Sequence, residues 1–334
     1  MKYKKILILF IFLIIITGCN NKEEYQGVVN VLNWSSYIPD EIIHDFERTY
    51  NIKVNYGTYS SNEELLAKIT SSKKGTYDLI FPSDYMVELM KEKNLIEKID
   101  KNKLTNYNNI NKIFLNQPYD KLNDYSIPFL STIVVIAVNR NNIKDNITSY
   151  NDLLNPKYKN NIVLIDDQRI VIGMSLLALG YGMNDTNNYH LEEAKNWLLK
   201  LKDNIKAYDS DSPKTFFMTN EADIGIMWNA EAELAKLKNP NIEIIDPIEG
   251  HAISTDNYCI VKGSKNIDNA YLLINYLTQN NISNDITKEY PYISPNSIKG
   301  NSNILPSTIF KNGYYVKNIG AYISNYDKLW ADIK

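Results

Sequence analysis

Short apolar runs alternate with amphipathic segments along most of the chain. Runs with the length and composition of β-strands occur at 28–32, 52–56, 78–81, 133–139, 162–165, 205–208, 224–227, 242–245 and 258–261. Segments whose apolar residues recur every three or four positions, as on one face of a helix, occur at 40–50, 62–72, 170–179, 191–201, 231–237, 267–277 and 283–289. Strands that alternate with helices are typical of βαβ units, so the pattern predicts an α/β fold with parallel strands.

The first 18 residues carry a different hydrophobic pattern. Three lysines within residues 1–5 precede an uncharged apolar run at 6–16, which is too short to span a bilayer comfortably as a helix. This order is typical of an export signal. Its end, Ile16-Thr17-Gly18-Cys19, resembles the lipobox of bacterial lipoproteins, which implies a signal peptide at 1–18, an acylated Cys19 and a polar tether at 19–27. An ordinary cleaved signal or a short anchor is the alternative.

Charge and cysteine content narrow the kinds of partner. The whole chain has a net charge of −3, and loss of the three lysines in the signal takes it to −6. Such a chain has no basic excess to neutralise phosphates, so nucleic acid is not an expected partner. If Cys19 carries lipid, no intrachain disulfide is possible, and Cys259 is expected to be a small buried apolar residue. The 316 residues after the signal are enough for two lobes.

Aromatic and acidic residues follow the carboxyl ends of four predicted strands. These segments are Asn33-Trp34-Ser35-Ser36-Tyr37, Pro82-Ser83-Asp84-Tyr85, Asp166-Asp167 and Trp228-Asn229-Ala230-Glu231. Ligands of open α/β sheets bind beyond the carboxyl ends of the strands, so we expect these side chains to meet at one site. Carboxylates pair with ammonium groups, and a ring face adds about 0.5 to 2 kcal/mol per cation–π contact. The combination suits an organic cation.

Each of these residues also has a structural alternative. Trp34 and Trp228 could be core side chains, because tryptophans are heavily buried on average. Asp84, Asp167 and Glu231 could be caps or first-turn acids of helices. The coincidence of four strand ends favours a binding site over these alternatives.

Taken together, segments along nearly the whole mature chain resemble the spermidine/putrescine-binding family that serves ABC importers. The set comprises Asn33-Trp34 with Tyr37, Tyr77-Asp78-Leu79 with Pro82-Ser83, Asn123-Asp124-Tyr125-Ser126-Ile127-Pro128, Asp166-Asp167, Met227-Trp228-Asn229, Glu249-Gly250, Asp256 and Pro295-Asn296. The resemblance implies a two-lobed type II periplasmic-binding-protein fold with the ligand in a cleft between the lobes. Lobe 1 would comprise 28–133 plus 257–292, and lobe 2 would comprise 134–256 plus 293–334.

The resemblance also implies which residues contact the ligand. These are Trp34, Tyr37, Ser83, Tyr85, Asp167, Trp228, Asp256 and Tyr292. Trp34 and Trp228 would flank the methylene chain. Asp256 would meet an internal or second amino group and Asp167 a terminal one, while the tyrosines and Ser83 would supply hydroxyls and ring edges.

Four positions depart from the spermidine-preferring pattern. Ser36 and Ile170 replace acids, Ser254 replaces a tryptophan and Val316 replaces a glutamine. The loss of two carboxylates disfavours a triply charged ligand, because an ammonium buried without a partner costs several kcal/mol. Glu231 falls where the putrescine-preferring branch has an acid. We therefore expect Asp167, Glu231 and Asp256 to bind a diamine such as putrescine, with Asp84 in reserve, and spermidine as the next candidate. Another small organic cation is a further alternative.

Enzyme and cofactor signatures are weak. His44, His190 and His251 lack metal-ligand neighbours at the usual spacing and are expected in surface or capping roles, so neither a metal nor a cofactor is predicted. The expected protein is a monomeric, lipid-anchored extracytoplasmic receptor that delivers a polyamine to an ABC permease. Two alternatives remain: a secreted hydrolase or transferase that uses Asp167, Glu231 and Asp256 as acid/base groups, and a surface adhesin.

Overall fold

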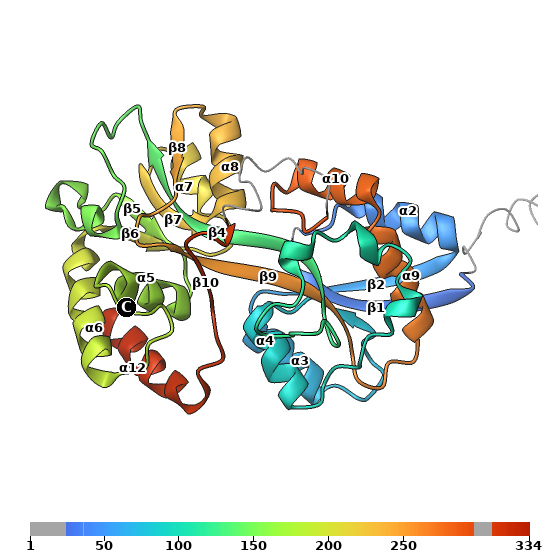
Figure 1. The fold of residues 1–334 in the computed structure, drawn as a ribbon. Helices are drawn as coiled ribbons and strands as arrows, with labels where there is room; N and C mark the ends of the chain where they lie inside the picture. Colours follow the sequence, from blue (N-terminus) through green and yellow to red (C-terminus); the bar gives the residue numbers. More distant parts are fainter. Residues whose placement is uncertain (1–24, 36, 297–308) are drawn as a thin grey trace, which may run out of the picture.

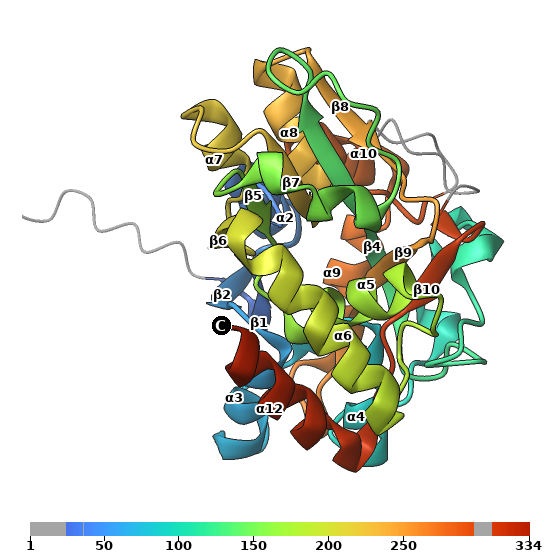
Figure 2. The same ribbon diagram turned by 90° about the vertical axis from the view of Figure 1, so that its left-hand side faces the viewer.

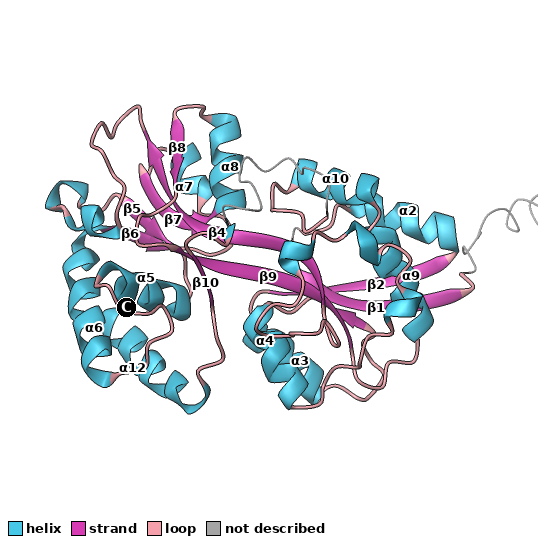
Figure 3. Cartoon of the chain, in the orientation of Figure 1, coloured by secondary structure: helices cyan, strands magenta, loops and turns pink. Residues whose placement is uncertain are grey.

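The structure is a computed structural model that describes residues 25–35, 37–296 and 309–334 (Figure 1). The predicted signal peptide, Cys19 and most of the predicted tether lie outside the described residues, as does Ser36. The described part folds into two lobes that share a ten-stranded mixed sheet, and helices cover its faces (Figures 1 and 3).

The first lobe begins with three parallel strands. β1 (Gly27–Trp34) pairs with β2 (Ile52–Tyr59) on one side and with β3 (Leu79–Ile80) on the other. Helices α2 (Asp40–Tyr50), α3 (Asn62–Ser71) and α4 (Asp84–Glu92) follow the three strands in turn. The carboxyl ends of β1 and β3 therefore lead into the Trp34–Tyr37 segment and the Ser83–Tyr85 segment at one edge of the sheet.

Two long antiparallel strands connect the lobes. β4 (Ile127–Asn139) and β9 (His251–Ile260) pair with each other, and the far end of β9 pairs with β3. The second half of β4 pairs with β7 (Ile224–Trp228) and β8 (Ile242–Ile245). Figure 1 shows β4 and β9 running from one lobe into the other, so they join the two halves of the molecule.

The second lobe contains a further parallel set. β5 (Ile162–Leu164) lies between β6 (Ile205–Tyr208) and β7, parallel to both. Its helices are α5 (Gln168–Ala178), α6 (Asn188–Leu201), α7 (Lys214–Met218) and α8 (Asn229–Lys238). The remaining elements are α9 (Ile267–Leu277), α10 (Asn280–Glu289), β10 (Gly313–Tyr315) and α12 (Ile323–Ile333). α9 packs on β1, whereas α12 packs on α5 and α6.

Seven short 3₁₀ helices complete the described secondary structure. They are η1 (Lys101–Lys103), η2 (Tyr107–Asn109), η3 (Lys112–Phe114), η4 (Tyr150–Leu154), η5 (Pro156–Tyr158), η6 (Lys202–Asn204) and η7 (Gly320–Tyr322). Within the described ranges, the structure has no helix long and apolar enough to cross a membrane. Cys259 is a fully buried free thiol, as expected.

The hydrophobic pattern predicted the α/β class correctly but shortened the two connecting strands. β4 starts at Ile127 instead of 133, and β9 starts at His251 instead of 258. Both strands carry polar residues that are nevertheless buried, such as Ser131 and Thr255, whose hydroxyls lie 2.9 Å apart. Burying a polar group costs little free energy when the group has a hydrogen-bond partner. The two strands can therefore continue through polar residues, which the search for apolar runs did not assign to a strand. The pattern also missed α4, α7 and α12.

Candidate ligand-binding cleft

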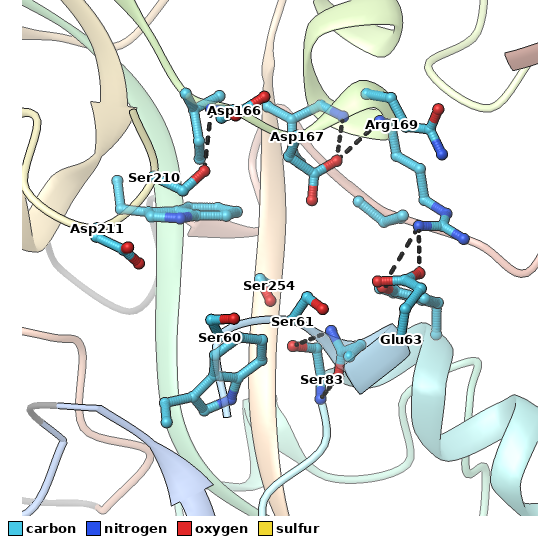
Figure 4. A pocket seen from close by; sticks show the side chains of 18 of the residues that line it. Ser60, Ser61, Glu63, Ser83, Asp166, Asp167, Arg169, Ser210, Asp211 and Ser254 are labelled. Carbon is cyan, nitrogen blue, oxygen red and sulfur yellow. Dashed lines mark hydrogen bonds and ion pairs between the residues drawn. The ribbon is translucent and has the colours of Figure 1, made fainter. Parts of the chain in front are cut away.

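A cavity of about 630 Å³ lies between the two lobes. Its wall on the first lobe comes from the segments after β1 and β3 and from the start of α3. The opposite wall comes from the segments after β5 and β7, from the start of α5 and from α12. Figure 4 shows side chains from both sides pointing into this space. The carboxyl ends of four strands thus meet at one cavity, as the sequence pattern predicted.

Eight of the nine residues expected to contact the ligand line this cavity. They are Trp34, Tyr37, Ser83, Tyr85, Asp167, Trp228, Asp256 and Tyr292. The ninth, Glu231, is not among the lining residues.

Asp256 of β9 is the most deeply buried of the expected acidic contacts, with 3% of its surface exposed. Tyr37 Oη donates a hydrogen bond of 2.7 Å to its Oδ2, and Ser83 Oγ donates one of 2.7 Å to its Oδ1. Burial raises the pKa of the Asp256 carboxyl to about 6, against the lowering effect of these hydroxyl donors. In the described part of the chain, no Lys or Arg forms an ion pair with this carboxylate. A cation that entered the cavity would supply the missing positive charge.

A set of aromatic rings surrounds the Asp256 carboxylate. The ring of Trp34 lies 4.6 Å from that of Tyr59, and the ring of Tyr37 lies 4.7 Å from that of Tyr292. Trp34 Nε1 donates a hydrogen bond of 3.0 Å to the Phe81 carbonyl oxygen, which fixes the indole plane. Trp228 lines the cavity from the other lobe, at the end of β7. Trp34 and Trp228 are only partly buried, so neither is purely a core side chain.

Asp167 combines the two roles that the sequence left open. It is the N-cap of α5, and its Oδ1 accepts hydrogen bonds from the backbone N–H groups of Arg169 at 2.8 Å and Ile170 at 3.1 Å. It also lines the cavity. Burial raises the pKa of the Asp167 carboxyl, and the two backbone donors oppose that shift. The helix N-terminus therefore orients a carboxylate toward the cleft.

Asp84 is buried and has a structural use. Its carboxylate accepts the backbone N–H of Tyr85 at 2.7 Å and that of Thr255 at 3.2 Å. These bonds connect the first turn of α4 to β9. Burial raises the pKa of the Asp84 carboxyl well above its ordinary value.

Glu231 is engaged away from the cavity. Lys214 Nζ donates to both of its carboxylate oxygens, at 2.9 and 2.8 Å. Glu231 lies in the first turn of α8, and Lys214 begins the neighbouring helix α7. The expectation that Glu231 joins Asp167 and Asp256 in the cleft does not match this arrangement, because its charge is already neutralised by a lysine far from it in sequence.

Three of the four positions that depart from the spermidine-preferring pattern belong to the cavity wall. Ile170, Ser254 and Val316 all line it, while Ser36 lies outside the described residues. Ile170 is 2% exposed and contributes an apolar side chain where the pattern has an acid. At this position the described wall presents no carboxylate.

An ion pair that the sequence did not reveal crosses the cleft. Arg169 Nη1 of α5 lies 2.9 Å from Glu63 Oε1 of α3 (Figure 4). The guanidinium carbon of Arg169 lies 4.5 Å from the centre of the Tyr85 ring. Arg169 lies two residues after Asp167, but Glu63 follows no predicted strand end directly. Trp330 and Lys334 of the C-terminal segment also line the cavity, and no sequence signal had pointed to them.

Metal ligation receives no support from the described ranges, where no group of three or more His, Cys, Asp or Glu side chains could hold a metal ion.

One histidine, His251, differs from the expectation that the histidines have surface or capping roles. His251 is fully buried in β9, and its ring nitrogens lie 2.6 Å from Asp246 Oδ1 and 2.9 Å from the Ile309 carbonyl oxygen. It therefore connects the C-terminal segment to β9 and has no surface role.

Comparisons with known proteins agree with this geometry. A family model described as bacterial extracellular solute-binding protein matches residues 41–298. The chain is 36% identical over 313 residues to the spermidine/putrescine-binding periplasmic protein of Escherichia coli (strain K12), and the match covers 90% of each chain. It is 27% identical over 286 residues to the putrescine/cadaverine-binding protein of Pseudomonas aeruginosa, a match that covers 80% of this chain and 79% of that one.

Solved structures show the same architecture. The TpPotD lipoprotein of Treponema pallidum superposes with a TM-score of 0.86 at 26% identity, covering 92% of this chain and 99% of that one. The spermidine/putrescine ABC transporter substrate-binding protein PotD of Streptococcus pneumoniae superposes with a TM-score of 0.79 at 29% identity, covering 92% and 98%. These similarities confirm the predicted two-lobed α/β fold of the periplasmic-binding class.

Proposed function

Because this chain belongs to the spermidine/putrescine-binding family of bacterial extracellular solute-binding proteins, we propose that it captures a polyamine in its cleft and delivers it to an ABC permease. It acts as a receptor and not as an enzyme. The hydrolase alternative would require the carboxylates to act as acid and base, whereas Asp167 caps a helix and Glu231 is paired with Lys214.

The observation that carries the proposal is the environment of Asp256. A carboxylate buried without a cationic partner destabilises the empty protein, and a bound ammonium would remove that penalty. The neighbouring rings of Trp34, Tyr37 and Tyr292 offer faces to the methylene chain of an amine. An anionic or apolar ligand would leave the buried charge uncompensated.

We assign the ligand contacts to the eight predicted residues that line the cavity. Asp256 takes one ammonium group and Asp167 takes the other, while Trp34 and Trp228 flank the chain between them. Tyr37 and Ser83 hold the Asp256 carboxylate, and Tyr85 and Tyr292 complete the wall. Glu231 is left out of this assignment.

The preferred ligand in this proposal is a diamine such as putrescine, ahead of spermidine. Several lining carboxylates are already engaged: Glu63 pairs with Arg169, Asp166 with Lys334, and Asp84 accepts two backbone N–H groups. Of the acids expected to contact the ligand, Asp167 and Asp256 then remain for two ammonium groups, while Asp211 is a further carboxylate of the wall. Ile170 stands where the spermidine-preferring pattern has an acid, so an ammonium placed at that position would lose its water without gaining a carboxylate.

Binding would be coupled to closure of the lobes. We divide the chain into lobe 1 (28–133 plus 257–292) and lobe 2 (134–256 plus 293–334), joined by β4 and β9. Trp34 and Ser83 lie on the first lobe, and Asp167 and Trp228 lie on the second. A ligand that contacts both lobes shifts the population toward the closed form, which the permease would recognise.

Membrane attachment is the remaining part of the proposal. The lipobox-like segment before Cys19 favours a lipid anchor on that thiol, outside the cytoplasm, with the rest of the protein as a monomer on the membrane surface. Metabolic labelling with a fatty-acid analogue would show incorporation into the wild-type protein and none into a Cys19→Ala variant.

Isothermal titration calorimetry tests the binding function. The chain lacking residues 1–19 is titrated with putrescine, cadaverine, spermidine and spermine. We expect heat with at least one of these amines and the tightest binding for the diamines. Absence of heat with all four would refute polyamine binding, and a ligand recovered chemically changed after long incubation would indicate an enzyme instead.

A further inference from the structure

The solvent-facing end of the cavity holds an ammonium group that belongs to the chain itself. Asp166, Trp330 and Lys334 line the same cavity as Asp167 and Asp256. The side chains of Asp166 and Lys334 are 39% and 36% exposed, whereas Asp256 is almost fully buried. We call the place formed by Asp166, Tyr208, Trp330 and Lys334 the mouth site.

Three groups surround the ammonium at the mouth site. Lys334 Nζ forms an ion pair with Asp166 Oδ1, and it lies 4.9 Å from the centre of the Trp330 ring and 5.1 Å from that of Tyr208. The two rings meet edge to face, with centroids 5.4 Å apart and planes at 80°. One carboxylate and two ring faces are the chemistry that binds an organic ammonium.

The mouth site is held in place without Lys334. The backbone N–H of Asp166 donates to Ser210 Oγ at 2.9 Å, which fixes the loop after β5. Gln168 Nε2 donates to Asp327 Oδ1 at 2.8 Å, and Lys195 Nζ pairs with Asp332 at 2.6 Å, so α12 is tied to both α5 and α6. Figure 2 shows α12 lying along α6, with the C-terminus at the end of α12. The carboxylate and the rings would therefore stay in position if the lysine side chain left.

Lys334 itself is weakly held. An ion pair between side chains this exposed contributes little to stability, and its strength falls with salt. Lysine has a flexible stem, so its ammonium can turn out to solvent at low cost. A second ammonium group that approached along the cavity would compete for the same carboxylate and rings.

We propose that the mouth site is a second ammonium-binding site, which Lys334 fills in the absence of a long ligand and which the third amino group of a tri- or tetra-amine takes over. The inference rests on the proposed function. Asp166 precedes Asp167 directly in the chain, so an amine that reaches past Asp167 arrives beside Asp166. Because Lys334 competes only with a third ammonium, it acts as a specificity residue that favours diamines.

Affinities of matched variants for putrescine and spermidine test the proposal by calorimetry. Lys334→Met should raise the affinity for spermidine about three- to tenfold, the size expected for one exposed ammonium contact, and change that for putrescine less than about twofold. Lys334→Arg should resemble the wild type, because a guanidinium fills the same site. Lys328→Met removes a lysine of α12, the helix that ends just before Lys334; Lys328 does not line the cavity, and its loss should leave both affinities within about twofold.

A second substitution shows whether the gain comes from the mouth site. Asp166→Asn in the Lys334→Met background should return the spermidine affinity to about the wild-type value, because the third ammonium then has no carboxylate partner at the mouth site, while the backbone bond of residue 166 to Ser210 is kept. Equal gains for both amines, or no gain, would overturn the mouth site while polyamine binding stands. If the wild-type protein binds neither amine, the proposed function fails together with this inference.

Discussion

Tyr37 Oη donates a hydrogen bond of 2.7 Å to Asp256 Oδ2, although the two residues are 219 positions apart. Tyr37 follows β1, and Asp256 lies on a strand that connects the lobes. Ser83, which follows β3, donates to the other oxygen of the same carboxylate. Two hydroxyls from two strand ends thus orient one buried charge toward the cleft.

Asp256→Asn should reduce polyamine affinity by about 100-fold or more, because the ammonium loses its buried partner. An amide of nearly the same shape keeps the packing. Calorimetry with putrescine measures the effect, and Asp268→Asn, an exposed change of the same charge on α9, is the control. Near-native affinity of the Asp256 variant would refute the role assigned to this carboxylate.

The same substitution should stabilise the ligand-free protein, although it weakens ligand binding. Folding raises the pKa of Asp256 from its ordinary 3.8 to about 6, so the folded state binds more protons between these values. Stability from this group is therefore present at low pH and is lost as pH rises through about 6. At pH 7, Asp256→Asn should stabilise the ligand-free protein by on the order of 1 to 3 kcal/mol. Thermal unfolding of both ligand-free proteins at pH 5 and pH 7 measures the effect, and an Asp256→Asn variant that is less stable than the wild type at pH 7 would contradict the prediction.

Polyamine affinity should fall in acid. The bound ammonium requires the Asp256 carboxylate, whose pKa is about 6 in the empty cleft. Affinity should be nearly constant above about pH 7 and should weaken by up to about tenfold per pH unit below 6. Titrations in buffers of different ionisation enthalpy should also show proton release near pH 6. An affinity that stays constant from pH 5 to pH 8 would mean that Asp256 is ionised throughout.

The Glu63–Arg169 pair should favour the closed form before any ligand binds. Glu63→Gln removes the ion pair across the cleft and leaves the Arg169 guanidinium over the Tyr85 ring. We expect a larger radius of gyration for the empty variant in solution scattering, the same radius as wild type with ligand, and affinity about two- to tenfold weaker. Glu64→Gln is the control, since Glu64 pairs with Lys68 on the same helix. Equal radii of gyration for the empty wild-type, Glu63→Gln and Glu64→Gln proteins would show that the Glu63–Arg169 pair does not favour the closed form.

Trp228→Leu should weaken binding by about three- to thirtyfold, because one ring face against the methylene chain is lost while the apolar wall remains. Trp34 is a poorer choice, since its indole also bonds to the Phe81 carbonyl oxygen and packs on Tyr59. Tyr322→Leu removes an exposed ring elsewhere and serves as the control. Unchanged affinity of the Trp228 variant would place the ligand away from β7.

Glu231→Gln tests whether Glu231 contacts the ligand, as expected from the sequence, or serves to pair with Lys214, as in the structure. The structure predicts diamine affinity within about twofold of wild type, together with a loss of about 1 to 3 kcal/mol in the free energy of unfolding, because Lys214 loses its anionic partner. Calorimetry and urea unfolding measure the two quantities. A strong loss of affinity with little loss of stability would restore Glu231 as a ligand contact.

Local pattern was sufficient for the α/β class, for most element positions and for six of the eight lining residues, whereas Asp256 and Tyr292 were implied only by the resemblance to the family. The reason is physical: strand and helix periodicities are local, and parallel strands bring their carboxyl ends to one edge whatever the details of packing. Trp34, Ser83, Asp167 and Trp228 could therefore be placed together before any coordinates. The sequence did not show which acidic side chains are neutralised by other residues.

Tertiary structure decided which charges remain free and how the lobes are joined. Glu231 and Asp256 are both buried acids, but Lys214 neutralises the first, whereas neutral hydroxyl groups donate hydrogen bonds to the second. The Glu63–Arg169 pair and the mouth site join segments that are distant in sequence, so the local pattern of apolar and polar residues could not predict them. Electrostatic pairing depends on distance in space, and the polar stretches of β4 and β9 became strands because buried partners satisfied them.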